Sequence, residues 1–152
     1  MRHFRYRFEV GASLQAVAEF HRDPHTLRRL TPPPVVVRFH YVEPMAEGSI
    51  AEFTLWFGPF PVRWRALHTQ VDATGFSDTM VKGPLRFWRH RHSFVALNDH
   101  KTLISEEIEF EYPQGLSGWW TRLLYSPFAL RLLFFYRSMI TRWMLEGDRK
   151  VK

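Results

Sequence analysis

Alternating apolar and polar residues mark most of the chain up to residue 112. In the first segment, Phe4, Tyr6, Phe8 and Val10 alternate with polar or charged residues, which is the two-residue period of a half-buried strand. Similar segments follow, and Gly, Pro, Asn or Asp residues form the turns that join them. The predicted strands after the first are residues 35–42, 50–57, 62–71, 76–82, 86–97 and 102–112.

Two short helices are predicted between the first and second strands. Ser13 is a suitable N-cap for the first helix, whose apolar residues recur at helical spacing. Asp23 and Pro24 suit the cap and the first position of the second helix. That helix must end before Thr31, because the three prolines that follow cannot continue it.

The C-terminal part of the chain has a different period. From Ala129 onward, large side chains recur every three or four residues, which predicts a long helix with one broad apolar face. The residues predicted to pack against the sheet are Ala129, Leu132, Leu133, Tyr136, Met139, Ile140, Trp143 and Met144. The residues predicted to lie on the opposite, outer side are Arg131, Ser138, Thr141 and Arg142.

These elements predict an α+β fold in one domain, residues 1–152. Strands joined by tight turns and followed by a helix favour a single antiparallel sheet. We therefore expect a seven-stranded curved sheet around the long C-terminal helix, with the two short helices between the first two strands. A curved sheet that grips a helix tends to leave a cavity between them.

The charges on the predicted outer face indicate the order of three strands. The last strand carries three glutamates, whereas the first carries Arg5 and Arg7 and the sixth carries Arg89 and Arg91. Opposite charges on neighbouring strands stabilise a sheet and like charges destabilise it. The acidic strand is therefore predicted to lie between the two basic strands, which places the first strand beside the last.

Composition narrows the possible classes of function. There are no cysteines, which excludes disulfides and thiolate metal sites. We expect a cytoplasmic protein, because no signal peptide or membrane-spanning segment is apparent. We expect it to be a monomer or a homodimer. Nucleic acid is not expected as a partner of this chain of net charge +6, because glutamates interleave with the arginines and no nucleic-acid-binding motif is present. The 14 Phe and 6 Trp suit either a ring-lined hollow or a filled core.

Several polar residues fall on strand positions that are predicted to face inward. His90 and His92 alternate with Arg residues on the sixth strand, and His68 lies on the fourth. Counting across the hairpin at residues 98–101 places His92 roughly opposite Glu106, and counting across the preceding turn places Asp78 near His90 or His92, within one register step. Two carboxylates and up to three imidazoles are therefore predicted to share one wall of the cavity.

This polar group has three interpretations. A carboxylate beside a histidine can tune both groups for proton transfer, so His90, His92, Asp78 and Glu106 are candidate catalytic residues. The same residues can orient a polar group on a hydrophobic ligand. They can also form a buried network that only satisfies its own hydrogen bonds. The paired histidines His90 and His92, joined by His68, also allow a metal, but we assign no metal and no cofactor.

The expected ligand contacts extend beyond the polar group. The residues predicted to line the cavity are Phe53, Trp64, His68, Asp78, Met80, Trp88, His90, His92, Phe94, Glu106 and Tyr136. Trp119 and Trp120 precede the terminal helix and flank Arg122. They suit a membrane interface, a lid over the cavity, or packing of the helix on the sheet edge.

The order of elements resembles the helix-grip fold of the START and Bet v 1-like superfamily. More specifically, the chain is similar to the SRPBCC group labelled polyketide cyclase/dehydrase. The segments that carry the resemblance are residues 21–24, residues 30–33, the tyrosine-arginine pair Tyr136-Arg137 after Phe135, and above all residues 76–94, where Asp78 is followed by Gly-Pro, Trp and His-x-His-x-Phe. The resemblance implies a deep hydrophobic pocket and no single reaction.

Three functions remain open from the sequence. The first is binding of a small hydrophobic molecule such as a lipid, sterol or polyketide. The second is a cyclase, dehydratase or isomerase reaction on a hydrophobic carbonyl compound, with a histidine as the base. The third is lipid transfer or docking on a membrane surface through Trp119, Trp120 and nearby arginines.

Overall fold

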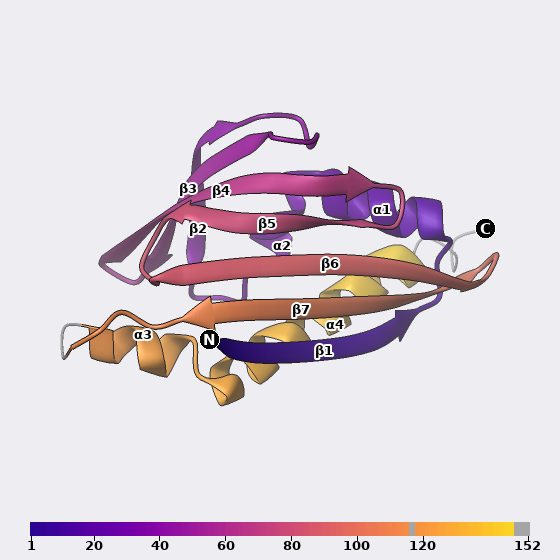
Figure 1. Cartoon of the computed structure of the whole chain (residues 1–152). Coiled ribbons are helices and arrows are strands. Elements are labelled where there is room, and N and C mark those ends of the chain that lie inside the picture. Colours follow the sequence, from indigo (N-terminus) through magenta and orange to yellow (C-terminus); the bar gives the residue numbers. More distant parts are fainter. Residues whose placement is uncertain (116–117, 148–152) are drawn as a thin grey trace.

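The computed structural model describes residues 1–115 and 118–147, and it confirms the α+β helix-grip architecture. Seven strands form one curved antiparallel sheet, with two short helices between β1 and β2 and a long helix near the C-terminus (Figure 1). The elements are β1 (Arg2–Val10), α1 (Leu14–Arg22), α2 (Thr26–Arg29), β2 (Val36–Val42), β3 (Ile50–Phe57), β4 (Phe60–Asp72), β5 (Gly75–Lys82), β6 (Phe87–Asn98), β7 (Lys101–Glu111), α3 (Trp119–Leu124) and α4 (Pro127–Gly147).

The strand order is β1-β7-β6-β5-β4-β3-β2, so the first strand lies beside the last as the charge pattern predicted. On the outer face, Arg5 Nε lies 2.8 Å from Glu107 Oε1 across β1 and β7. Arg89 lies 2.6 Å from Glu109 across β6 and β7. The register places His92 opposite Glu106 and Asp78 opposite His90, which confirms the counting across both hairpins.

The segment between β1 and β2 begins as predicted and then differs. The Ser13 hydroxyl accepts a hydrogen bond from the backbone N–H of Ala16 and caps α1. The second helix was predicted to start at Pro24, but α2 begins at Thr26. The Asp23 side chain instead accepts from the backbone N–H of His25, a local turn that postpones the helix.

The face of α4 that packs on the sheet is not the predicted face. The buried residues are Leu130, Phe134, Ser138 and Thr141, each 1% exposed, whereas Trp143 is 74% exposed. Ser138 and Thr141 were predicted to point outward. Burial of Ser138 is tolerated because its hydroxyl donates to the carbonyl of Phe135 one turn earlier. Trp119 and Trp120 belong to an additional short helix, α3, that was not predicted.

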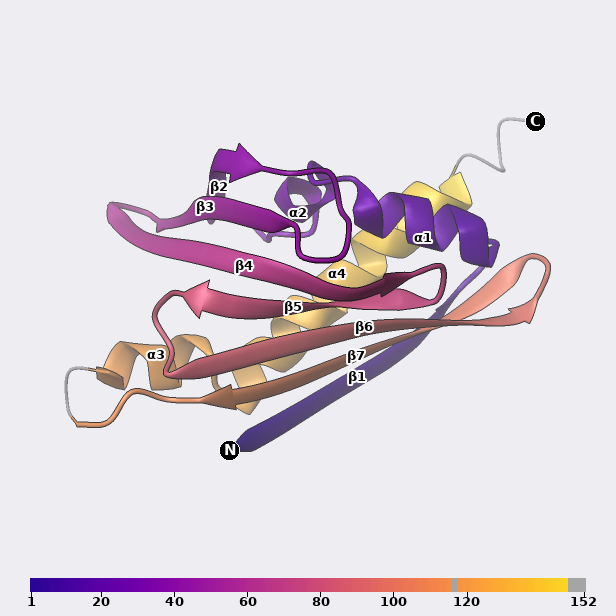
Figure 2. The same cartoon turned by 45° about the horizontal axis from the view of Figure 1, so that its top comes forward.

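Helices α1, α2 and α4 lie on the same side of the sheet, and α4 crosses it at an angle (Figure 2). The core between them has two parts. One part surrounds Trp64, Trp88 and Phe134 under the first half of α4. The other surrounds Phe76, Phe94 and Ile104 under α1. Among the described residues, no helix is long and apolar enough to cross a membrane.

Candidate functional site

A cavity of about 210 Å³ lies between the sheet and helices α1, α2 and α4. Its wall is mostly apolar, with ring side chains from β3, β4 and β6 and Leu133 from α4. For scale, an engineered cavity of about 150 Å³ in another protein is large enough to bind benzene. The space therefore suits a molecule of one or two rings or a comparably short chain.

Most of the predicted lining residues are in this wall, and some are not. Those in the wall are Phe53, Trp64, His68, Asp78, Trp88, His90 and His92. Met80 packs against the side of the first core cluster, and Phe94 is buried under α1 in the second. Glu106 is outside the wall but lies 2.8 Å from a ring nitrogen of each of the two histidines of β6.

Tyr136 is also outside the wall, because α4 is rotated from its predicted orientation. Its hydroxyl faces the backbone carbonyl of Arg29 at 3.5 Å. The assignment of the wall residues as ligand contacts stays a prediction.

The polar end of the cavity is a cyclic arrangement of two carboxylates and two imidazoles. Glu106 Oε2 lies 2.8 Å from His90 Nε2 and 2.8 Å from His92 Nδ1. Asp78 Oδ2 lies 3.6 Å from His90 Nδ1 and 3.3 Å from His92 Nε2. All four ring nitrogens therefore face a carboxylate oxygen. The His92–Glu106 contact is electrostatic, because that nitrogen makes no well-directed hydrogen bond.

The charges in this cluster follow from burial and from its internal contacts. Burial alone would lower the pKa of His92, but the charge of Glu106 and the contacts with Asp78 raise it to about 9. Burial alone would raise the pKa of Glu106, but His92 and His90 hold it well below its usual range. The pKa of Asp78 is lowered in the same way. Burial and the charge of His92 lower the pKa of His90. Near neutral pH, His92 is therefore charged and His90 is neutral between two ionised carboxylates.

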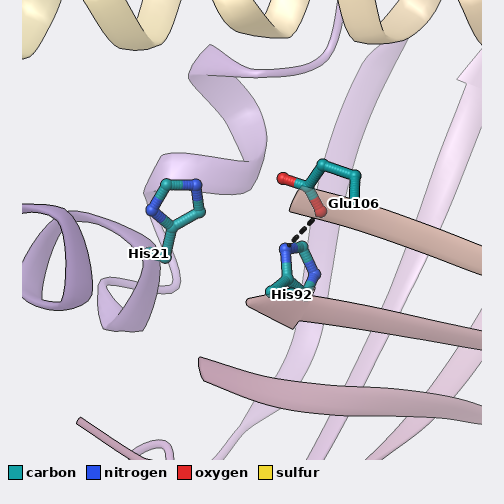
Figure 3. A group of neighbouring side chains, drawn as sticks. All are labelled: His21, His92 and Glu106. Atoms are coloured by element: carbon teal, nitrogen blue, oxygen red, sulfur yellow. Dashed lines mark ion pairs between the residues drawn. The ribbon is translucent and has the colours of Figure 1, made fainter. Parts of the chain in front are cut away.

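Two further polar residues, which the sequence pattern did not predict, reach this end of the cavity. His21 from α1 faces His92 and Glu106 (Figure 3), and its Nδ1–H donates to the carbonyl of Val17. Burial lowers the pKa of His21 to about 4, so the ring is neutral and its Nε2 is an acceptor. The sequence held a signal for the burial of His21, because it follows Val17 by four residues and so lies on the same, buried face of α1.

Arg137 is the second unassigned residue. Its guanidinium is on the cavity wall, above the ring of Phe134, and its Nε donates to the carbonyl of Leu30. Burial lowers the pKa of Arg137, and the nearby charges of Glu106 and Asp78 oppose this effect. The positive charge of Arg137 balances the excess negative charge of the carboxylate–histidine cluster.

Two sets of donor atoms in this cluster are close enough to hold a metal. One set is His21, His92 and Glu106, and the other is Asp78, His90 and His92; within each set the atoms lie within 4.8 Å of one another. In both sets, however, His92 already contacts a carboxylate, Glu106 in one and Asp78 in the other, and the guanidinium of Arg137 faces the same cavity. A metal would have to replace these contacts, so we assign none.

Comparisons with known proteins place the chain at the level of the fold. No protein-family model matches the sequence, and no curated protein matches it. A START superfamily protein from Mycobacterium smegmatis is similar in structure, with a TM-score of 0.71 and 11% identity, over 95% of this chain and 97% of that one. The Zhui aromatase/cyclase from a Streptomyces species has a TM-score of 0.67 and 14% identity, over 99% and 96%.

A third similar structure is norcoclaurine synthase from Thalictrum flavum in complex with dopamine and hydroxybenzaldehyde. Its TM-score is 0.66 at 16% identity, over 95% of this chain and 87% of that one. At these identities the likeness shows the fold and does not transfer an activity. The resemblance to the START and Bet v 1-like SRPBCC proteins is therefore confirmed as a shared helix-grip fold.

Proposed function

We propose that this protein binds a small hydrophobic molecule in the cavity under α4. The observation that carries the proposal is a cavity of about 210 Å³ whose wall is mostly apolar but ends in a compact group of polar side chains. Ligand sites commonly have this construction, because the apolar surface provides affinity and a few polar groups fix the orientation. The similar structures with bound or processed ring compounds support the proposal by analogy.

The head group of the ligand meets His21 and Arg137 in this proposal. The nitrogens of His90 and His92 already face carboxylates, so these rings have little capacity left for a ligand. In contrast, His21 offers a free Nε2, and Arg137 has further N–H donors beside the one given to Leu30. A ligand oxygen that accepts from Arg137 would satisfy a half-buried cation on the cavity wall that, among the described residues, makes no ion pair with a carboxylate.

The arrangement favours binding over acid–base catalysis. A general base needs a free nitrogen with a pKa near the working pH. His92 has the raised pKa, but carboxylates face both of its nitrogens, while His21 has a free nitrogen and a pKa of about 4. A cyclase, dehydratase or isomerase remains the alternative. In that case Asp78 and Glu106 orient the histidines, and His92→Gln abolishes turnover while affinity is retained.

The test compares three two-ring probes, naphthalene, 2-naphthol and 2-naphthoate, by calorimetry. Ala66 is buried in the cavity wall, so the larger side chain of Ala66→Leu fills part of the cavity. We expect this variant to bind each of the three probes at least tenfold more weakly. Ala96→Leu is the matched control, because Ala96 lies on the exposed end of β6.

The head-group assignment has its own pair of variants. Arg137→Gln is expected to weaken the binding of 2-naphthoate by about tenfold to a hundredfold, since a hydrogen bond to a charged group contributes about 1.5–3 kcal/mol. The binding of naphthalene, which has no oxygen, should change little. Arg131→Gln, on the exposed side of the same helix, is expected to change neither. The proposal is wrong if no probe binds the unmodified protein and native mass spectrometry finds no co-purified hydrophobic molecule.

A further inference from the structure

The side of α4 that faces away from the sheet is unusually apolar. Large hydrophobic residues recur there every three or four positions, which places them along one line of the helix. These residues, here called the α4 outer stripe, are Phe128 (73% exposed), Leu132 (54%), Phe135 (53%), Met139 (45%) and Trp143 (74%). An aligned set of exposed rings and aliphatic chains on a single helix marks an interaction site rather than scattered surface residues.

Helix α3 adds to this surface. Trp119 is 67% exposed and Leu123 is 64% exposed, and α3 is joined to α4 through Tyr125 and Ser126. Figure 1 shows α3 at the end of the sheet where α4 begins. The exposed apolar residues therefore continue from one helix to the next.

The charged side chains of α3 and α4 themselves are almost all positive. Arg122, Arg131 and Arg142 are exposed on α3 and α4. Glu146 is the only acidic residue in the sequence of these two helices, and its carboxylate accepts a hydrogen bond from the backbone N–H of Gly11. The partner of this surface therefore combines apolar material with negative charge.

We propose that the α4 outer stripe, together with α3, docks on an anionic membrane surface. Tryptophan, phenylalanine and leucine side chains on one face of a helix enter the boundary between headgroups and acyl chains, while arginines contact lipid phosphates. The helix lies in the plane of the surface, with its buried face still on the sheet. The three exposed arginines of these helices, Arg122, Arg131 and Arg142, agree with this orientation.

A second copy of the chain is a less suitable occupant on grounds of charge. A two-fold interface repeats the same patch on both partners. Pairing of two outer stripes would bring Arg131 and Arg142 of one copy close to the same residues of the other, without an acidic residue on either stripe. An anionic surface neutralises these charges instead.

The experiment is flotation of the full chain with vesicles of phosphatidylcholine alone and with 30% phosphatidylglycerol. We expect the unmodified protein to bind the anionic vesicles. The double variant Leu132→Ser with Trp143→Ser should bind them at least tenfold more weakly. Both residues are exposed, so these substitutions leave the core intact. Arg131→Gln with Arg142→Gln is expected to weaken vesicle binding about tenfold. Phe60→Ser, 71% exposed outside the two helices, is the control and should bind normally.

Two outcomes overturn the proposal. One is that the unmodified protein does not float with anionic vesicles, or that the stripe variants float as well as the Phe60 variant does. The other is a concentration-dependent dimer, seen by light scattering, that the stripe substitutions convert to a monomer while vesicle binding is absent. That result assigns the surface to a second copy. Because vesicle binding does not use the cavity, failure here leaves the proposed ligand site untouched.

Discussion

The two faces of strands β6 and β7 carry similar charges in opposite surroundings. On the outer face, Arg89 pairs with Glu109 where both side chains are 32–52% exposed. On the inner face, the charged His92 pairs with Glu106 where both side chains are only 5–10% exposed. Water screens the outer pairs, so each contributes little and can be exchanged. The inner group has lost its hydration, so each member depends on its partners. Ion pairs on the two faces of the same strands therefore have very different consequences for stability.

The largest expected effect tests the inner face. Glu106→Gln keeps the shape of the side chain but leaves the charge of His92 without its main partner. We expect the free energy of unfolding, measured with urea at pH 7, to fall by about 3–5 kcal/mol, the usual cost of removing one member of a buried pair. A loss below about 1 kcal/mol would contradict the description of Glu106 as a buried and ionised partner.

The next effect is a dependence of stability on pH. The folded pKa of His92, about 9, is above the ordinary value of 6.5, so its contribution is complete below pH 6.5 and is lost as the pH rises to 9. The shift corresponds to about 3 kcal/mol. His21 acts in the opposite direction, because its pKa of about 4 makes stability fall as the pH drops below 6.5.

Urea unfolding measured from pH 4 to pH 10 is therefore expected to show a maximum near pH 6.5. His92→Gln serves as the comparison, and it should remove the decline between pH 6.5 and pH 9. An unchanged alkaline slope in that variant would assign the decline to another group.

The smallest effect completes the comparison on the outer face. Glu109→Gln changes the same strand three residues from Glu106, but its partner Arg89 is about half exposed. We expect the free energy of unfolding to fall by at most about 1 kcal/mol at low salt, and by less in 1 M sodium chloride, where screening is stronger. A loss as large as that of Glu106→Gln would show that exposure does not separate the two faces.

The sequence was sufficient to predict the sheet and much of the polar cluster. Strand residues alternate between the faces, so counting from the turn at residues 98–101 placed His92 roughly opposite Glu106, and a register shift between Ala96 and Asn98 sets the exact pairing. The charges of Arg5 and Glu107 located β1 beside β7, because only that order pairs opposite charges.

The orientation of α4 was not predictable from the same kind of pattern. Large apolar residues occur on every side of this helix, so periodicity did not distinguish the buried side from the outer stripe. Ser138 and Thr141 look like surface residues but are buried, since short hydroxyl side chains fit where the helix approaches the sheet closely. The error in orientation also hid Arg137, which follows Phe134 by three residues and so reaches the cavity wall.

The position of β1 has a consequence for how the chain folds. Arg2 pairs with Phe110 and Val10 with Thr102, so the first strand to be synthesised has no sheet partner until β7, the last strand, is available. Contacts between such distant parts of a chain slow folding, because the intervening loop must close first. We expect the hairpins from β3 to β7 to form early and the N-terminal strand to join late, sealing the sheet as the terminal helix packs beneath it.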